Sequence, residues 1–197
     1  MNKPKLAIVI GSVRPNRFAD HPTQWIADIA RQRGDFDVEV VDLKDHPLPF
    51  FAEEISPMYA PSKGTAAQRW QHKIAGFDAY IFITAEYNHG PTAVLKNALD
   101  YAYKEWANKP AAFVGYGGVG GARAVEQLRL HAVELQMAPI RTAVHILAPQ
   151  YLAVAREGKK LGEFEFLNQG ARDMLDQLAW WTKALKTARE QVILEAA

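Results

Sequence analysis

The run Leu6-Ala7-Ile8-Val9-Ile10, closed by Gly11, indicates the fold class of this chain. A short, uninterrupted apolar run with branched side chains is typical of a strand that is buried on both faces of a sheet. Similar runs recur further along the sequence. We therefore predict a strand in each of five segments, which are 6–10, 38–43, 79–84, 111–115 and 140–147.

Between these runs, apolar residues recur at the spacing of an amphipathic helix. The clearest stripe comprises Val94, Leu95, Ala98, Leu99 and Ala102. Comparable patterns predict four further helices. One of them ends before Gly34, and the other three span residues 64–76, 124–135 and about 168–193.

Five strands that alternate with five helices predict a parallel sheet with helices on both faces, which is a three-layer α/β sandwich. The proline-rich stretch 46–61 has no regular pattern and should be a long excursion from the sheet. The connection that ends at Gly162 is likewise expected to hold no element of the sheet. Because no change of composition marks a boundary, we expect a single domain over residues 1–197.

The composition of the 197 residues excludes several functional classes. A formal net charge of +1 gives no electrostatic reason to expect nucleic acid or an anionic membrane as a partner. The absence of cysteine excludes thiolate metal sites, and the six histidines form none of the usual metal-binding spacings, so we expect no metal. No apolar run has the length of a signal-peptide core or a membrane span, and we therefore expect a cytoplasmic protein.

Ligands of an open parallel sheet bind outside the carboxyl ends of the strands, near the point where the strand order reverses. This rule selects the loops after the first, third and fourth predicted strands. In the first loop, Ser12 and Asn16 offer hydrogen bonds, and Arg14 and Arg17 offer charge, which together suit a phosphate. The alternative is a surface turn with solvated arginines. The loop lacks the Gly-Lys-Ser/Thr of a nucleoside-triphosphate site.

The loop after the third strand places Glu86 and His89 at the end of a buried segment. Glu86 could act as a general base and His89 as a general acid. Residues of this kind more often hold a loop in place by hydrogen bonds, and spacing alone favours that structural role.

The loop after the fourth strand, Gly115-Tyr116-Gly117-Gly118-Val119-Gly120, matches the pattern G-x-G-x-x-G. A dinucleotide site also needs an acidic residue at the end of the next strand, and 140–147 ends without one. We interpret these glycines as allowing a flat ring to lie against the backbone. A Rossmann-type site is the less favoured alternative.

Three motifs together resemble one family. These are Gly-Ser-x-Arg at 11–14, Glu-Tyr-Asn at 86–88 followed by Leu-Lys-Asn-Ala-Leu-Asp at 95–100, and Gly-Gly-x-Gly-Gly-x-Arg-Ala at 117–124. Their order and spacing resemble the NADPH-dependent FMN reductase family of flavodoxin-like proteins, over about residues 6–148. The resemblance implies a five-stranded parallel sheet of order 2-1-3-4-5 and a bound FMN. It also implies NADPH or NADH as co-substrate, and a quinone-like or other small electron acceptor.

The resemblance also implies positions for the cofactor. Residues of the first loop would surround the phosphate, residues of the third-strand loop would run beside the isoalloxazine, and glycines of the fourth-strand loop would line its other edge. The implied set is Ser12, Arg14, Asn16, Arg17 and Phe18, then Glu86, Tyr87, Asn88 and His89, then Gly117, Gly118 and Val119. The chain departs from the family at Arg17, where a second serine is common.

The chemistry implied by the resemblance belongs to the flavin, so no catalytic side chain is expected and ping-pong kinetics would follow. One alternative is a flavodoxin-like electron carrier, but such carriers are typically acidic. The other alternative is a Rossmann-type dehydrogenase. The apolar run at 48–51 and the aromatic final helix need covering, which predicts a homodimer or homotetramer.

Overall fold

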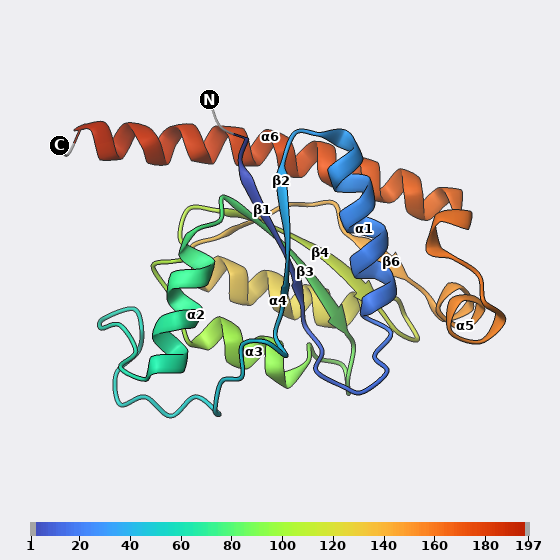
Figure 1. The fold of residues 1–197 in the computed structure, drawn as a ribbon, viewed down its shortest axis with the longest axis horizontal. Coiled ribbons are helices and arrows are strands. Elements are labelled where there is room, and N and C mark those ends of the chain that lie inside the picture. The colour runs from blue at the N-terminus through green and yellow to red at the C-terminus, as the bar shows by residue number, and fades with distance from the viewer. Residues whose placement is uncertain (1–2, 196–197) are drawn as a thin grey trace.

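The computed structural model describes residues 3–195, with side chains described as far as residue 192. Strands and helices alternate through most of this length (Figure 1). The first half holds β1 (Lys5–Ile10), α1 (Asp20–Arg33), β2 (Asp37–Asp42), α2 (Thr65–Ala75), β3 (Ala79–Ala85) and α3 (Ala93–Asp100). The second half holds β4 (Pro110–Tyr116), α4 (Ala122–Glu134), β5 (Ala138–Pro139), β6 (Val144–Ile146), α5 (Ala148–Glu157), the 3-10 turn η1 (Leu161–Glu163) and α6 (Glu165–Glu195).

The sheet is parallel, with the order β2-β1-β3-β4-β5, and β6 also pairs with β4. Ile8 of β1 lies between Val40 of β2 and Ile81 of β3. The predicted order is therefore confirmed, as are the parallel sheet and the flavodoxin-like fold class. The order reverses between β1 and β3, which makes the carboxyl ends of these two strands the switch point of the sheet.

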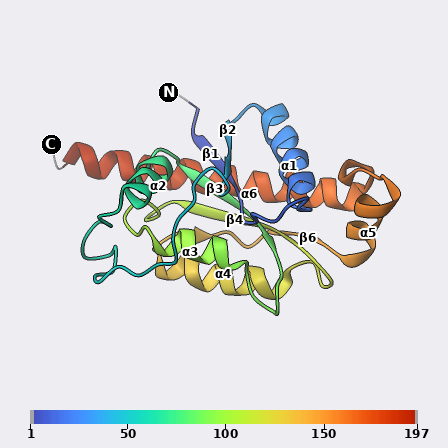
Figure 2. The same cartoon turned by 60° about the horizontal axis from the view of Figure 1, so that its bottom comes forward.

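Helices cover both faces of the sheet, because successive side chains of a strand point to opposite faces. Leu6, Ile8 and Ile10 of β1 pack in one core with α1, α5 and α6. Ala7 and Val9 pack in the other core with α2, α3 and α4. Figure 2 shows α3 and α4 together on one side of the strands, with α1 on the other.

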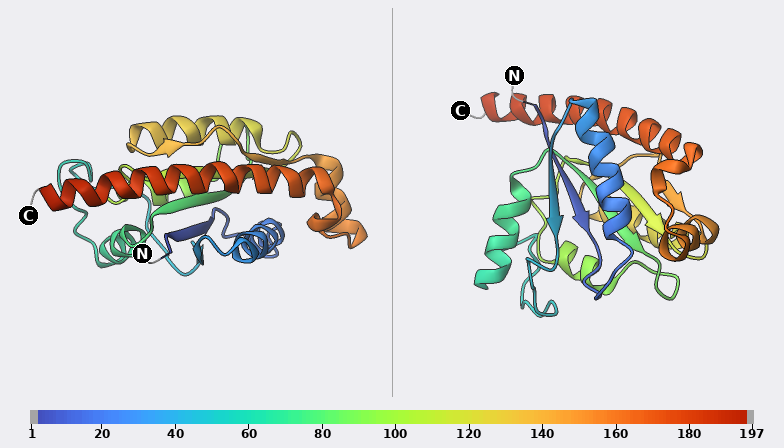
Figure 3. Two further views of the ribbon diagram at one scale, coloured as in Figure 1. Left: turned by 90° about the horizontal axis from the view of Figure 1, so that it is seen from above. Right: turned by 45° about the vertical axis from the view of Figure 1, so that its right-hand side comes forward.

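The long helix α6 crosses the sheet toward the amino ends of the strands. Lys186 and Arg189 of α6 form ion pairs with Asp78, which precedes β3, at 2.8 Å and 2.9 Å. The right-hand view of Figure 3 shows the strand arrowheads pointing away from this helix. The carboxyl edge of the sheet is therefore left to the loops. No helix within residues 3–195 has the length and apolarity needed to cross a membrane.

The predicted fifth strand, 140–147, is wrong in its extent. Only β6, at 144–146, lies within the predicted segment; β5 lies just before it, and after Ile140, whose N–H still donates to Ala111, the chain leaves the sheet until β6. Arg129 of α4 donates to the carbonyls of Ile140 and Arg141, and the N–H of Thr142 donates to Oε1 of Gln177 at 2.9 Å. Side chains of the flanking helices thus form hydrogen bonds with backbone groups that, in a continuous strand, would be available to pair in the sheet.

Two helices also differ from prediction. The segment 148–157, part of the connection in which no helix was predicted, forms α5, which has Pro149 in its first turn and ends at Gly158 with φ 74°. Proline near a helix start and glycine just past its end are ordinary boundary residues. Helix α6 begins at Glu165 rather than near Asn168. The irregular stretch 46–61 and the stop of α1 at Gly34 are confirmed.

Candidate functional site

The three predicted loops meet at the carboxyl edge of the sheet around a cavity of about 230 Å³. Seven of the predicted residues line it, together with Ala85, Tyr116 and Tyr151. The seven are Arg14, Asn16, Arg17, Phe18, Glu86, Tyr87 and Gly117. A second space, a groove that also borders Arg14 and Tyr87, is lined by Ser12. The other four predicted residues line neither the cavity nor this groove; they are Asn88, His89, Gly118 and Val119.

Ser12 is held where β1 leaves the sheet. The N–H of Gly11 donates to the carbonyl of Ile83 in β3 at 2.9 Å, and the hydroxyl of Thr92 donates to the carbonyl of Gly11. A Cβ on Gly11 would lie 2.5 Å from the Ile83 carbonyl oxygen, so only glycine allows this approach. Ser12 is buried, and its Oγ makes no close hydrogen bond within the described chain; its one polar neighbour is the Tyr116 hydroxyl, whose pKa it lowers against the larger effect of burial. Such a group is costly unless a ligand satisfies it.

The guanidinium of Arg17 is hydrogen-bonded to acceptors within the protein. Its guanidinium forms a two-pronged pair with Asp42 at the end of β2, donates to Asp20 at 2.8 Å and donates to the carbonyl of Ser12. Only 5% of its side chain is exposed. Burial would raise the pKa of Asp42, but the hydrogen bonds from Arg17 outweigh that cost and lower it. Both groups therefore stay charged at neutral pH.

Arg14 is exposed and differs from Arg17 in having no carboxylate partner among the described residues. Its guanidinium lies 5.7 Å from the centre of the Tyr87 ring, and Nη1 is 3.4 Å from the Tyr87 hydroxyl. The hydrogen bond with Tyr87 raises the pKa of Arg14, so the side chain keeps its charge. Arg14 is thus the cation of this loop that is free to meet an anion.

The loop after β3 ends in a tight hairpin turn. Tyr87 and Gly90 exchange two backbone hydrogen bonds of 3.0 Å, and Asn88 and His89 between them have φ of 49° and 70°. Two central residues with positive φ define the type I′ turn. Gln127 of α4 donates to the His89 carbonyl at 2.7 Å and fixes the turn from outside. Asn88 and His89 therefore stand at the exposed tip of the loop.

Glu86 joins the loops that follow β3 and β4. Its carboxylate accepts hydrogen bonds from the N–H of Arg123, at 3.1 Å, and from the Arg123 guanidinium. Its own N–H donates to the carbonyl of Tyr116 at 3.2 Å. Burial raises the pKa of Glu86, but the Arg123 contacts prevail and lower it. This geometry supports the structural role over general-base catalysis.

The glycine loop after β4 has two parts. A Cβ on Gly120 would lie 2.8 Å from Cβ of His145, and one on Gly121 would lie 2.8 Å from the N of Tyr116, so both are required by packing. A Cβ on Gly118 would meet nothing within 4 Å. Gly117 has φ 144°, and a Cβ there would contact Cβ of Glu86 at 3.6 Å, so of these two glycines only Gly118 faces open space, as a flat ligand would require.

Sequence reasoning missed an aromatic wall of this cavity. The ring of Phe18 lies 5.1 Å from that of Tyr116 and 4.4 Å from that of Tyr151. Tyr116 directly follows the predicted strand 111–115 and precedes Gly117, and that position was a usable signal. Tyr151 lies on α5, a helix that the sequence did not predict. Burial raises the pKa of Tyr116, which keeps its hydroxyl protonated.

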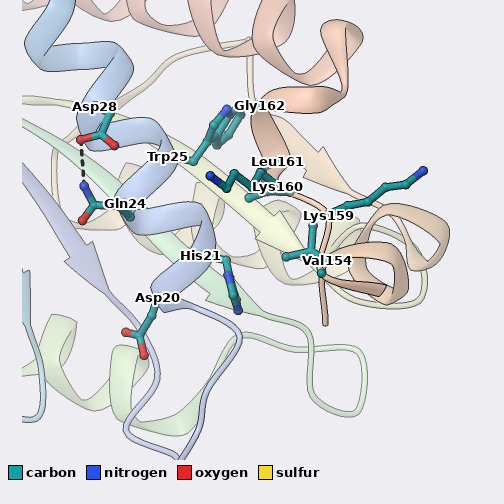
Figure 4. Close-up of a pocket in the computed structure, with 11 residues that line it drawn as sticks. Asp20, His21, Gln24, Trp25, Asp28, Val154, Lys159, Lys160, Leu161 and Gly162 are labelled. Atoms are coloured by element: carbon teal, nitrogen blue, oxygen red, sulfur yellow. Dashed lines mark hydrogen bonds between the residues drawn. The ribbon is translucent and has the colours of Figure 1, made fainter. Parts of the chain in front are cut away.

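Two further spaces lie near this cavity. A groove of about 510 Å³ lies on the other side of Arg14 and Tyr87, and Leu48, Pro49 and Phe50 form part of its wall. A cleft of about 690 Å³ lies between the start of α1 and the α5–η1 connection (Figure 4). No predicted site residue lines this cleft, whose charged side chains are Asp20, Asp28, Lys159 and Lys160, together with His21.

The sequence matches the NADPH-dependent FMN reductase family over residues 4–149. It is 38% identical over 145 residues to an NAD(P)H-dependent FMN reductase of Schizosaccharomyces pombe, covering 72% of each chain. It is 31% identical over 138 residues to NADPH:quinone oxidoreductase of Arabidopsis thaliana, covering 68% of each.

The fold is similar to that of FerB, a flavoenzyme NAD(P)H:(acceptor) oxidoreductase from Paracoccus denitrificans. The TM-score is 0.73 at 23% identity, and the match covers 92% of this chain and 98% of FerB. The matched segment 4–149 contains all three loops that meet at the cavity, and it is well over half of the chain. From the sequence match and the arrangement of these loops, we conclude that this protein belongs to the NADPH-dependent FMN reductase family.

Proposed function

We propose that this protein oxidises NADPH or NADH and reduces a quinone-like or other small acceptor by a ping-pong mechanism, with FMN bound at the carboxyl edge of the sheet. The observation that carries the proposal is the buried Oγ of Ser12 at the switch point between β1 and β3, which makes no close hydrogen bond to any described residue. In the sheet order 2-1-3-4-5, this is the place where a flavin mononucleotide is held.

The residues at this edge fit the parts of FMN. Ser12 offers a hydroxyl and Arg14 a free charge to the phosphate, which is why we assign both to the phosphate end. Tyr87 and Gly117 line the cavity, and Gly118 next to them has open space at its Cβ position, so we assign these three residues to the isoalloxazine. We assign Asn16 and Phe18 to the phosphate loop. Glu86, Asn88, His89 and Val119 are assigned to the loops that border the ring.

When bound, FMN supplies the redox chemistry by accepting hydride at N5 from the nicotinamide and passing electrons to the acceptor. The protein's own contribution is to bind and orient. Glu86 is tied to Arg123 and so holds two loops at a fixed separation rather than moving a proton. Arg14 and Tyr87 separate the cavity from the adjoining groove, whose apolar wall suits an uncharged ring.

The structure offers less support to the two alternatives. A Rossmann-type site needs an acidic residue at the end of the strand after the glycine loop, and β6 ends in Ile146, followed by Leu147. A one-electron carrier is typically acidic, whereas this chain has a formal net charge of +1. Ping-pong kinetics follow from the proposal if donor and acceptor use the same exposed face of the ring in turn.

We also propose a homodimer or homotetramer formed by a single-domain chain. Phe50 is 85% exposed and Trp180 is 66% exposed, and apolar surface of this kind is covered in most proteins. Sedimentation analysis at micromolar concentration should give a multiple of the chain mass, and the mass of one chain would contradict the proposal. A cytoplasmic location stays a prediction.

Anaerobic mixing with NADPH tests the activity. The purified protein should be yellow, NADPH should bleach its flavin absorbance, and a benzoquinone should then restore the colour. Varying both substrates should give parallel lines in reciprocal plots, as ping-pong kinetics require. A yellow protein that NADPH does not bleach would support the electron carrier instead, and a colourless protein that binds no added FMN would contradict the flavin site.

A further inference from the structure

We propose that Arg17 is a positioning residue: it fixes the phosphate loop through Asp42 and Asp20 and leaves the phosphate charge to other groups. This inference rests on the proposed function, because it concerns the same FMN site. It also differs from what the sequence suggested, which was that the arginine replaces a family serine as a direct phosphate contact.

The contacts of Arg17 reach three separate parts of the site. Nη1 and Nη2 pair with both carboxylate oxygens of Asp42, which ends β2. Nε donates to Asp20, the first residue of α1, at 2.8 Å. Nη1 also donates to the carbonyl of Ser12, directly after β1. One side chain thus links the end of β2, the start of α1 and the peptide of the buried serine.

The charges at this position argue against direct phosphate binding. Arg17 carries one positive charge and is paired with two carboxylates, so the three groups together are net negative. A phosphate placed against them would meet Asp42 and Asp20 as well as the guanidinium. Arg14 is exposed and has no carboxylate partner among the described residues, and it supplies the free cation of the loop.

The shape of the side chain explains why arginine stands here. A guanidinium presents a planar fork of donors that matches a carboxylate at two points while still donating in other directions. A lysine ammonium is a point charge on a flexible stem and cannot hold the Asp42, Asp20 and Ser12 acceptors together in one plane. The contacts of Arg17 therefore depend on its geometry and not on its charge alone.

Two mechanisms give opposite expectations for the same variants. If Arg17 acts by position, removing its guanidinium or the Asp42 carboxylate should loosen the phosphate loop and weaken FMN binding. If Arg17 instead turns away from Asp42 to bind phosphate, Asp42→Asn should free the cation and strengthen FMN binding, and Arg17→Lys should largely keep it.

The test is titration of the full-length protein, freed of flavin by dialysis, with FMN and with riboflavin, which lacks the phosphate. Arg17→Met and Arg17→Lys should each weaken FMN binding roughly tenfold or more, as loss of charge-assisted hydrogen bonds does. Asp42→Asn should weaken it in the same direction, by roughly severalfold. Riboflavin affinity should change little in all three variants, which a general loss of structure would not allow.

Two further variants serve as controls. Arg33 forms a matching network with Asp35 and Asp176 at the far end of α1, so Arg33→Met should lower the melting temperature yet keep the FMN-to-riboflavin affinity ratio. Arg14→Met should lower that ratio by removing the free cation. If Arg17→Met does not fold, the Asp42→Asn and Arg17→Lys results decide the question.

The possible outcomes are distinct. Tighter FMN binding in Asp42→Asn, or full FMN affinity in Arg17→Lys, would overturn the positioning role and leave the flavin site standing. Equal loss of FMN and riboflavin would also overturn it. A wild-type protein that binds neither flavin would contradict the proposed function, and this inference with it.

Discussion

Glu86 and Arg123 connect two loops that follow neighbouring strands. The carboxylate accepts the backbone N–H of Arg123 at 3.1 Å and a second bond from its guanidinium, although 37 residues separate the two in sequence. The side chain of Glu86 is only 5% exposed, whereas that of Arg123 is 46% exposed. The edge of the proposed flavin site is thus set by a contact at the start of α4, where an anion is also favoured by the helix dipole.

Glu86→Gln separates a structural role from an acid–base role. The amide keeps the shape but loses the charge, so we expect roughly 1–3 kcal/mol lower stability from the weakened contact with Arg123. The pH profile of kcat should keep its form, because Glu86 exchanges no proton in the proposed mechanism. Measuring the melting temperature and the pH profile together distinguishes the two roles. If an ionisation disappears from the profile of the variant, Glu86 acts as a general base.

Ser12→Ala tests the buried hydroxyl. In the flavin-free protein the Oγ makes no close hydrogen bond to the described residues and has only the Tyr116 hydroxyl as a polar neighbour, so its removal should change the melting temperature little. FMN affinity should nevertheless fall by roughly 0.5–1.5 kcal/mol, the usual net contribution of a hydrogen bond. Thr23→Ala is a useful comparison, because the Thr23 hydroxyl is also buried but already donates to the carbonyl of Ala19 at 2.7 Å. If the Ser12→Ala variant keeps full FMN affinity, Ser12 does not contact the phosphate.

Lys109 makes stability depend on pH in the alkaline range. It is buried at the start of β4, where Nζ donates to the carbonyl of Ala75 at 3.0 Å, and burial, with repulsion from Arg189, lowers its pKa to about 8. Between pH 8 and 10 the folded protein loses this proton while the unfolded chain keeps it, so stability should rise with pH by up to about 3 kcal/mol.

The rise should reverse above about pH 10, because the unfolded chain then ionises tyrosines that the fold keeps neutral. Burial raises the pKa of Tyr80 and of Tyr116 in the folded protein. Urea unfolding across this range measures the effect. Lys109→Met should abolish the rise between pH 8 and 10, and a wild-type curve that is flat there would contradict the assignment to Lys109.

The parts of this fold that could be predicted are those decided by local pattern. The run 79–83 is apolar because β3 is buried on both faces, and every residue of β3 is indeed buried. The fifth strand could not be placed correctly, since side chains of two helices bind its backbone groups, Arg129 from the helix just before it and Gln177 from a helix 35 residues further on.

The same limit applies to the candidate site. Rules for open sheets identified the three loops, since the carboxyl ends of parallel strands must share one edge. They could not show that Arg17 pairs with Asp42, because that contact depends on side-chain direction where β1 and β2 end together. Tyr151 was missed for another reason, namely that α5 has no apolar stripe clear enough to mark it as a helix.

Gly118→Val tests whether the flavin lies against the loop after β4. Gly118 is exposed, and a Cβ there would meet no atom within 4 Å, so the fold itself can accept a side chain. The melting temperature of the flavin-free protein should therefore change little. If the ring occupies the open space at Gly118, the valine methyls would project into it, and flavin bound per folded chain should fall severalfold or more.

Gly162→Val is the matched control for this change, because Gly162 also has open space at its Cβ position but lies in η1, by the cleft next to α1. The two variants should have similar melting temperatures without flavin and should differ in flavin content. If Gly118→Val keeps full flavin occupancy, the ring does not contact this loop, and the glycines would serve only the turn into α4. That turn needs Gly120 and Gly121, whose Cβ positions are blocked, and places no such demand on Gly118.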